Sequence, residues 1–206
     1  MSVARSISFR RKTQKQVIKT GGNSINSAKK SMNVLGDCFE QVLVNKSFQK
    51  LTDIGGGKRY HNEGNAFVHT MIVFKHACDI FPDDFDMQMV ALLHDVGKVY
   101  TGRKKEDGDW EYPYHSVVGA ETLLEFAPDD FYLYPGLEKI RFYVRNHIKP
   151  LFWDEYPELT EENVNLAKLA ICDLLGSYPE NRAANNEKIL FLSEFVRKQD
   201  PNFNVM

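Results

Sequence analysis

The sequence predicts an all-α protein, and three observations carry this prediction. Hydrophobic residues recur at helical spacing in several stretches, and the alternation typical of a strand persists in none of them. Prolines and glycines separate these stretches into segments of helix length. Hydrophobic residues make up 43% of the chain and charged residues 26%, which is ordinary for a globular domain. We therefore expect a compact helical bundle.

The expected helices follow from where the hydrophobic periodicity starts and stops. Pro82 closes one of them, Gly97 another, and Thr160 is an N-cap with acidic residues in the turn behind it. A polar stretch at 99–114 is expected to be a long loop, which in a compact domain is often functional. The helices are expected at about residues 37–51, 67–80, 84–96, 116–126, 137–147, 160–176 and 181–198.

The stretch ALLHDVGK at residues 91–98 ends one of these helices with a histidine and an aspartate. Adjacent helical residues point about 100° apart, so His94 and Asp95 can both reach a cation beyond the helix end. An aspartate is rarely buried unless it is paired. Imidazole and carboxylate together suit Zn, Fe, Mn, Co or Ni. A solvated or internally paired His–Asp dipeptide is the ordinary alternative.

Charge is distributed unevenly along the chain. Residues 1–36 hold eight basic residues and no acidic one, which leaves 18 basic and 28 acidic residues for the rest. We expect a basic, flexible N-terminal tail, rich in Ser, Asn and Gly, in front of an acidic domain. Such a tail favours contact with RNA by charge alone, whereas a merely solvated leader or an organellar transit peptide has a similar composition.

The three cysteines form no CxxC pair and are odd in number, which favours a reducing compartment and argues against a thiolate metal site. No run of 18 apolar residues is present, and the N-terminus lacks the apolar core of a secretory signal. We therefore expect a cytoplasmic protein without membrane contact.

Histidines and aspartates, whose side chains can bind metals, are spread over five expected helices and lie near the end of several of them. Four histidines and two aspartates, one or two per helix, are a suitable ligand set for one or two divalent ions in a helical bundle. Each also has a structural alternative, such as a core histidine bonded to a carbonyl or a capping aspartate. The candidates are His69, His94, Asp95, His115, His147 and Asp173.

The order His69, His94-Asp95, Asp173 resembles the H…HD…D signature of the HD-domain phosphohydrolase superfamily. ALLHDVGK (91–98) is similar to its central motif, and ICDLLGS (171–177) to its closing segment. HNEGNAFVHTMIVF (61–74) resembles a segment in the HD domain of some tRNA nucleotidyltransferases, and YPYHSVVGAE (112–121) resembles the GHE-x-x-GA segment. Tyr114 and Ser116 depart from that last pattern. We find no nucleotidyltransferase head, so residues 37–206 are interpreted as a free-standing HD domain of about 6–8 helices.

The resemblance implies a site and a reaction. His69, His94, Asp95 and Asp173 would hold one divalent ion, and His115 and His147 are similar to the added ligands of dinuclear members, in which Asp95 bridges two ions. Mn, Ni, Co, Fe, Mg and Zn all remain open. A bound cation brings the pKa of its water to about 7 and polarises a phosphoryl oxygen. Asp95 and Lys98 are therefore the expected catalytic residues, and Lys98, Arg145 and Arg103 the expected phosphate contacts.

Three classes of function follow from this sequence. The first is a phosphohydrolase, a phosphatase or phosphodiesterase that acts on a small phosphate ester such as a nucleotide, or on an RNA-derived cyclic phosphate. The second is a di-iron oxygenase of the HD type, and the third a metal- or nucleic-acid-binding module without turnover. Apolar positions in the last helix suggest a homodimer. Aromatic residues near the site are candidates for stacking a base, namely Trp110, Tyr112, Tyr114, Phe152 and Trp153.

Overall fold

The computed structural model describes residues 36–55, 64–178 and 182–205. Over these ranges the regular elements are helices apart from one two-stranded hairpin, which confirms the prediction of an all-α fold. A first helix is described over residues 36–44. It is followed by α2 (Lys46–Gln49), η1 (Lys50–Asp53), α3 (Ala66–Ile80), α4 (Phe85–Leu93), α5 (Lys98–Thr101), β1 (Arg103–Lys104), β2 (Trp110–Glu111), α6 (His115–Thr122), η2 (Leu123–Glu125), η3 (Phe131–Leu133), α7 (Leu137–Asn146), η4 (Lys149–Phe152), α8 (Glu161–Gly176) and α9 (Arg182–Arg197).

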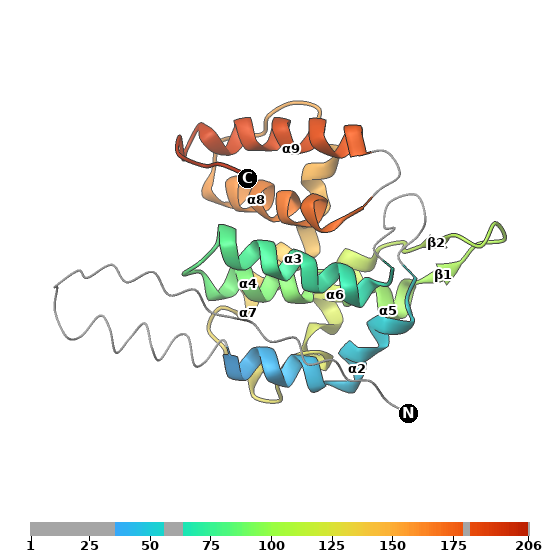
Figure 1. The fold of residues 1–206 in the computed structure, drawn as a ribbon. Helices are drawn as coiled ribbons and strands as arrows, with labels where there is room; N and C mark the ends of the chain where they lie inside the picture. Colours follow the sequence, from blue (N-terminus) through green and yellow to red (C-terminus); the bar gives the residue numbers. More distant parts are fainter. Residues whose placement is uncertain (1–35, 56–63, 179–181, 206) are drawn as a thin grey trace, which may run out of the picture.

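Helix α3 lies at the centre of the bundle (Figure 1). It packs against α4 on one side and α8 on the other, and α8 in turn packs against α9. Helices α6 and α7 pair with each other, and α7 also contacts α4. The hairpin of β1 and β2 projects away from the helices (Figure 1). Five helices that carry candidate ligands are thereby packed in one continuous body.

Polar N-caps set where the main helices begin. The side chains of Asn65, Asp84 and Thr160 each accept a hydrogen bond from a backbone N–H in the first turn of α3, α4 and α8, respectively. Such caps satisfy donors that have no partner within the helix. Thr160 was predicted as the cap of α8, and the observed helix ends at Gly176 as expected.

Three local features differ from the sequence prediction. The expected helix at 37–51 is interrupted at Asn45, whose side chain accepts hydrogen bonds from Ser47 and Phe48 and caps α2 instead. The helix before the His–Asp pair ends at Leu93, and residues 94–97 form turns that lead into α5. The expected loop at 99–114 contains the end of α5 and the hairpin, in which Arg103 pairs with Glu111.

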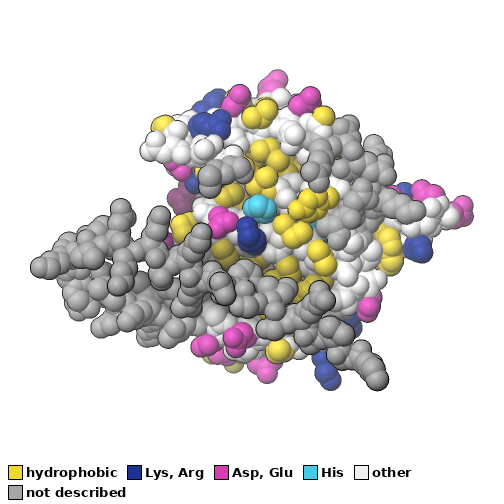
Figure 2. Space-filling view, viewed as in Figure 1, with side chains coloured by type: hydrophobic (Ala, Val, Ile, Leu, Met, Phe, Trp, Pro, Cys, Tyr) yellow, Lys and Arg dark blue, Asp and Glu magenta, His cyan; other side chains and the backbone are white. Residues whose placement is uncertain are grey.

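The hydrophobic core forms two clusters, one around α3, α4 and α7 and one between α8 and α9. The apolar residues of α9, among them Leu192, Phe195 and Val196, are buried in the second cluster, whereas Leu190 is exposed. The hydrophobic positions that suggested a homodimer are therefore mostly occupied in packing within the chain. Figure 2 shows further hydrophobic side chains at the surface around the outer face of α3.

The predicted basic tail at residues 1–36 lies outside the described residues except for its last position. None of the described helices is both long enough and apolar enough to cross a bilayer.

Candidate metal centre

Five helical segments bring the six predicted ligands to one buried place. His94 and His147 are the C-cap residues of α4 and α7, and His115 is the first residue of α6. His69 lies in the first half of α3, Asp95 in the turn after α4, and Asp173 in the last turns of α8. His69, His94, Asp95 and His147 have relative exposures of at most 2%. The cluster is thus assembled from segments more than 100 residues apart.

Asp95 lies at the middle of the cluster, and its two carboxylate oxygens face different histidines. Oδ2 is 3.6 Å from Nε2 of His69 and 3.3 Å from Nε2 of His94. Oδ1 is 3.4 Å from Nε2 of His115 and 3.9 Å from Nε2 of His147. The ligand atoms therefore form two groups that share Asp95. This is the arrangement expected of a carboxylate that bridges two cations.

Asp173 extends the first of these groups. Its Oδ1 lies 3.0 Å from Nε2 of His69. The contact depends on close packing of α8 against α3, because a Cβ at Gly176 would lie 2.5 Å from Cγ2 of Val73. The carbonyl of Gly176 also lies 3.4 Å from Nδ1 of His69. Gly176 thus lets α8 deliver both an aspartate and a backbone acceptor to His69.

Backbone carbonyls orient the other three histidine rings. Nδ1 of His94, His115 and His147 lies 2.8 Å from the carbonyl of Ala91, 2.9 Å from that of Tyr112 and 2.7 Å from that of Val144, respectively. A carbonyl only accepts, so Nδ1 of each ring donates, and in the neutral ring Nε2 keeps its lone pair. All three Nε2 atoms face Asp95. This is the ring orientation and tautomer that a metal-binding histidine requires.

The electrostatics of the cluster favour the protonation states of ligands. Burial lowers the pKa of His147 to about 3 and also lowers the pKa of His115, so both rings are neutral at pH 7. Burial acts to raise the pKa of Asp95, but His94 and Lys98 outweigh it and hold that pKa well below its usual range. The pKa of Asp173 is lowered by its hydrogen bond with His69 despite burial. Both aspartates are therefore carboxylates.

A glycine contact holds His115 in place. A Cβ at Gly97 would lie 2.0 Å from the carbonyl oxygen of His115 and 2.5 Å from the backbone nitrogen of Gly119. The turn after Asp95 can approach the start of α6 only because position 97 has no side chain. Tyr114, directly before His115, has a φ of 57°, which is rare outside glycine and marks a strained entry into α6. The sequence pattern singled out Gly97 as a helix stop and not as this contact.

The predicted phosphate-contacting residues lie in different surroundings. Lys98 is buried, and its Nζ is 2.5 Å from Oδ2 of Asp95 and 4.9 Å from the ring centre of Tyr112. Arg103 lies on the hairpin and pairs with Glu111. Arg145 pairs with Glu121 of α6. Of these three residues, Lys98 alone has a contact with a member of the cluster among the interactions described.

The donor set fits divalent metal ions. Nε2 of His94 is fully buried and makes no hydrogen bond within the described part of the chain, and such a group is costly unless something binds it. Nε2 of His115 and Nε2 of His147 face each other at 3.2 Å. Imidazole nitrogen and carboxylate oxygen ligands without a thiolate suit Zn, Fe, Mn, Co or Ni. The buried cluster is thus consistent with a divalent metal site.

Comparison with known proteins agrees with the geometry. The family model of the HD domain matches residues 66–176, which is more than half of the chain, and the protein belongs to this family. The match begins at the first residue of α3 and ends at the last residue of α8. It therefore includes all six residues of the cluster. Comparisons with curated proteins and with solved structures gave no match. Membership in the HD family indicates a metal-dependent hydrolase.

Proposed function

We propose that the protein is a phosphohydrolase that cleaves a phosphomonoester or phosphodiester with the help of one or two divalent ions. A nucleotide or an RNA-derived cyclic phosphate is the proposed class of substrate. The observation that carries the proposal is Asp95, whose two oxygens face two separate groups of histidines. One carboxylate shared in this way would allow the two groups to hold a pair of ions, and paired divalent ions are common in enzymes that transfer phosphoryl groups.

The residues of the cluster form two sets of candidate ligands. His69, His94 and Asp173 with Asp95 would hold one ion, and His115 and His147 with Asp95 would hold a second. The chemistry supplied by a bound divalent ion is a lowered pKa of water and a polarised phosphoryl oxygen. The backbone carbonyls orient the histidine rings so that Nε2 of each ring faces Asp95, and this geometry exists before substrate arrives.

Lys98 is the proposed phosphate-contacting residue of this centre. Its ammonium group lies against Asp95 and over the ring of Tyr112, in a position where a fixed positive charge can stabilise charge developing on a phosphate. Tyr112 stacks on Trp110 with an interplanar angle of 8°, and Tyr114 is 80% exposed beside His115. These three aromatic side chains are proposed to line the approach to Lys98. Trp153 instead packs against Phe195.

Hydrolysis of a panel of phosphate esters by the purified protein tests the proposal. The panel contains a generic diester, nucleoside monophosphates and triphosphates, and 2′,3′-cyclic nucleotides, with Mn, Ni, Co, Mg, Zn or Fe added in turn. Asp95→Ala serves as the inactive variant. His76→Ala is the matched control, because His76 lies on α3 like His69 but belongs to neither ligand group of the described residues. Turnover that needs metal, disappears in Asp95→Ala and persists in His76→Ala supports the phosphohydrolase.

The same protein samples decide between this function and its alternatives. Oxygen consumption by the iron-loaded protein, without release of phosphate, would favour a di-iron oxygenase. Protein that holds metal but cleaves no ester and consumes no oxygen would favour a binding module. Either result contradicts the proposed function.

A further inference from the structure

A cleft of about 620 Å³ lies between α6 and α7, away from the metal centre. It is lined by Ala120 and Glu121 of α6 and by Glu138, Arg141, Phe142 and Arg145 of α7. None of the six candidate ligands lines it. Arg145 and His147 are two residues apart, so they point about 200° apart around α7. The cleft and the metal centre therefore lie on different sides of the same helix.

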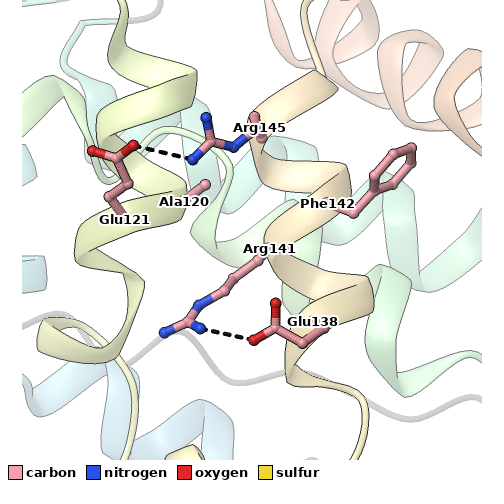
Figure 3. A pocket seen from close by; sticks show the side chains of 6 residues that line it. All are labelled: Ala120, Glu121, Glu138, Arg141, Phe142 and Arg145. Carbon is pink, nitrogen blue, oxygen red and sulfur yellow. Dashed lines mark hydrogen bonds and ion pairs between the residues drawn. The ribbon is translucent and has the colours of Figure 1, made fainter.

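The two arginines are placed as a pair. Arg141 and Arg145 are four residues apart in one helix, so they share a face. Figure 3 shows both side chains reaching from α7 toward α6. Two guanidinium groups on adjacent turns repel each other unless anions lie between them. In the structure, Glu138 and Glu121 supply that negative charge.

The side chains of both glutamates are largely exposed to solvent. Glu138 Oε1 lies 2.8 Å from Arg141 and Glu121 Oε1 lies 3.1 Å from Arg145, but the glutamate side chains are 80% and 61% exposed. Ion pairs of this kind contribute little and exchange readily with water and other anions. Nε of Arg141 is buried and makes no hydrogen bond within the described residues. This donor of Arg141 is therefore unsatisfied while the ion pair with Glu138 is formed.

We propose that this cleft binds the phosphate group of a small molecule through Arg141 and Arg145, as a second site distinct from the metal centre. A phosphate dianion offers enough oxygens to accept from both guanidinium forks, whereas a single carboxylate is matched by one fork. The volume lies within the range of small-molecule sites. The proposal does not depend on catalysis, because binding at the cleft requires no residue of the metal centre.

Titration calorimetry on the full-length metal-loaded protein at constant ionic strength tests the proposal. The probes are inorganic phosphate and α,β-methylene-ADP, whose carbon bridge resists hydrolysis between the two phosphates. The titration is expected to contain a component from binding at the cleft and a component from binding at the metal centre. Only the component from the metal centre persists when the two arginines are replaced. In Arg141→Gln/Arg145→Gln, the dissociation constant of the cleft component is expected to rise about tenfold or more.

The opposite change separates a binding role from a structural one. Glu121→Gln/Glu138→Gln removes the competing carboxylates, so the cleft is expected to bind phosphate about threefold more tightly or better. If the arginines only brace α6 against α7, removing their partners cannot raise the affinity. Lys75→Gln is the control, since Lys75 forms an exposed ion pair with Asp79 on α3. Thermal melts report whether each variant is folded.

The probes and the variants also identify the source of the phosphate. Binding of inorganic phosphate as tight as that of the nucleotide analogue assigns the cleft to the free ion, and tighter binding of the analogue assigns it to a phosphorylated small molecule. Affinities for both probes that are unchanged in Arg141→Gln/Arg145→Gln would overturn the proposal. Arginine-dependent binding of a single-stranded oligonucleotide, without binding of either probe, would overturn it in favour of a nucleic-acid contact.

Discussion

Nε2 of His115 lies 3.2 Å from Nε2 of His147, and Nδ1 of each ring faces a backbone carbonyl. With both Nδ1 atoms donating, two nitrogen lone pairs point at each other. A proton between them is disfavoured, because burial lowers the pKa of both rings. Both nitrogens, together with Oδ1 of Asp95, would hold a divalent cation, and its positive charge would offset the repulsion between the lone pairs. This pair of histidines is therefore the strongest sign of a second ion.

Single substitutions are expected to remove the two ions separately. His147→Ala deletes a ligand of the second group only, so the metal content of the purified protein is expected to fall from two ions per chain to one. Asp95→Ala deletes the shared ligand and is expected to lose both. Elemental analysis measures the number of ions bound per chain after dialysis against buffer that contains a trace of the metal.

His76→Ala is the control for these measurements, since it also removes an imidazole from the bundle. Its metal content is expected to equal that of the wild type, because His76 lies in neither ligand group of the described residues. A wild-type content of one ion that His147→Ala leaves unchanged would refute the two-ion interpretation.

Lys98→Met is expected to separate catalysis from metal binding. Nζ of Lys98 lies 2.5 Å from Oδ2 of Asp95, so the ammonium competes with a cation for that oxygen. Without it, metal affinity is expected to rise, whereas kcat/KM for a phosphate ester is expected to fall about a hundredfold. The metal-free variant leaves a buried carboxylate without its cation and is expected to lose about 3 kcal/mol of stability.

Metal titrations, ester hydrolysis and urea unfolding measure these three effects. Arg103→Gln is the matched variant, because Arg103 pairs with Glu111 on the exposed hairpin and has no described contact with the cluster. A smaller loss of activity in Lys98→Met than in Arg103→Gln would assign the phosphate contact to the hairpin.

Gly97→Ala tests whether the turn after Asp95 positions α6. The added Cβ would meet the His115 carbonyl oxygen at 2.0 Å, so the start of α6 has to move. We expect the second ion to bind more weakly and the free energy of unfolding to fall by about 1–3 kcal/mol. Gly36→Ala, at a site with nothing within 4 Å of the added atom, is the control and is expected to be neutral. Unchanged metal affinity in Gly97→Ala would show that α6 absorbs the shift elsewhere.

The sequence predicted the helices with strong caps and the residues of the cluster, since these depend on local patterns. Asp84 and Thr160 mark helix starts through their own side chains. His94 and His147 directly follow helices, where a C-cap histidine can bond the carbonyl three residues back. Because each contact spans only three residues, it is a local signal for the orientation of these two rings.

Features that depend on contacts between distant segments could not be predicted from the sequence. Gly97 lies in close contact with α6, and Gly176 lies in close contact with α3. The residues next to each glycine in the sequence do not indicate which helix it contacts. Arg145 was expected at the phosphate of the metal centre because it precedes His147. The turn of the helix points it into a different cleft, where it pairs with Glu121.

The metal-free protein is expected to lose stability as the pH falls. Burial lowers the pKa of His147 from 6.5 to about 3 in the folded state, so between these values the unfolded chain binds the additional proton. The stabilisation is complete above pH 6.5 and is lost progressively down to about pH 3, and His147 alone accounts for up to about 5 kcal/mol. The lowered pKa values of Asp95 and Asp173 act in the same direction at lower pH. Urea unfolding at pH 7, 6, 5 and 4 in the presence of a chelator measures the slope. His147→Gln removes the titrating ring and is expected to flatten the slope between pH 6 and 4, so an equal slope in both proteins would show that His147 is not the group responsible.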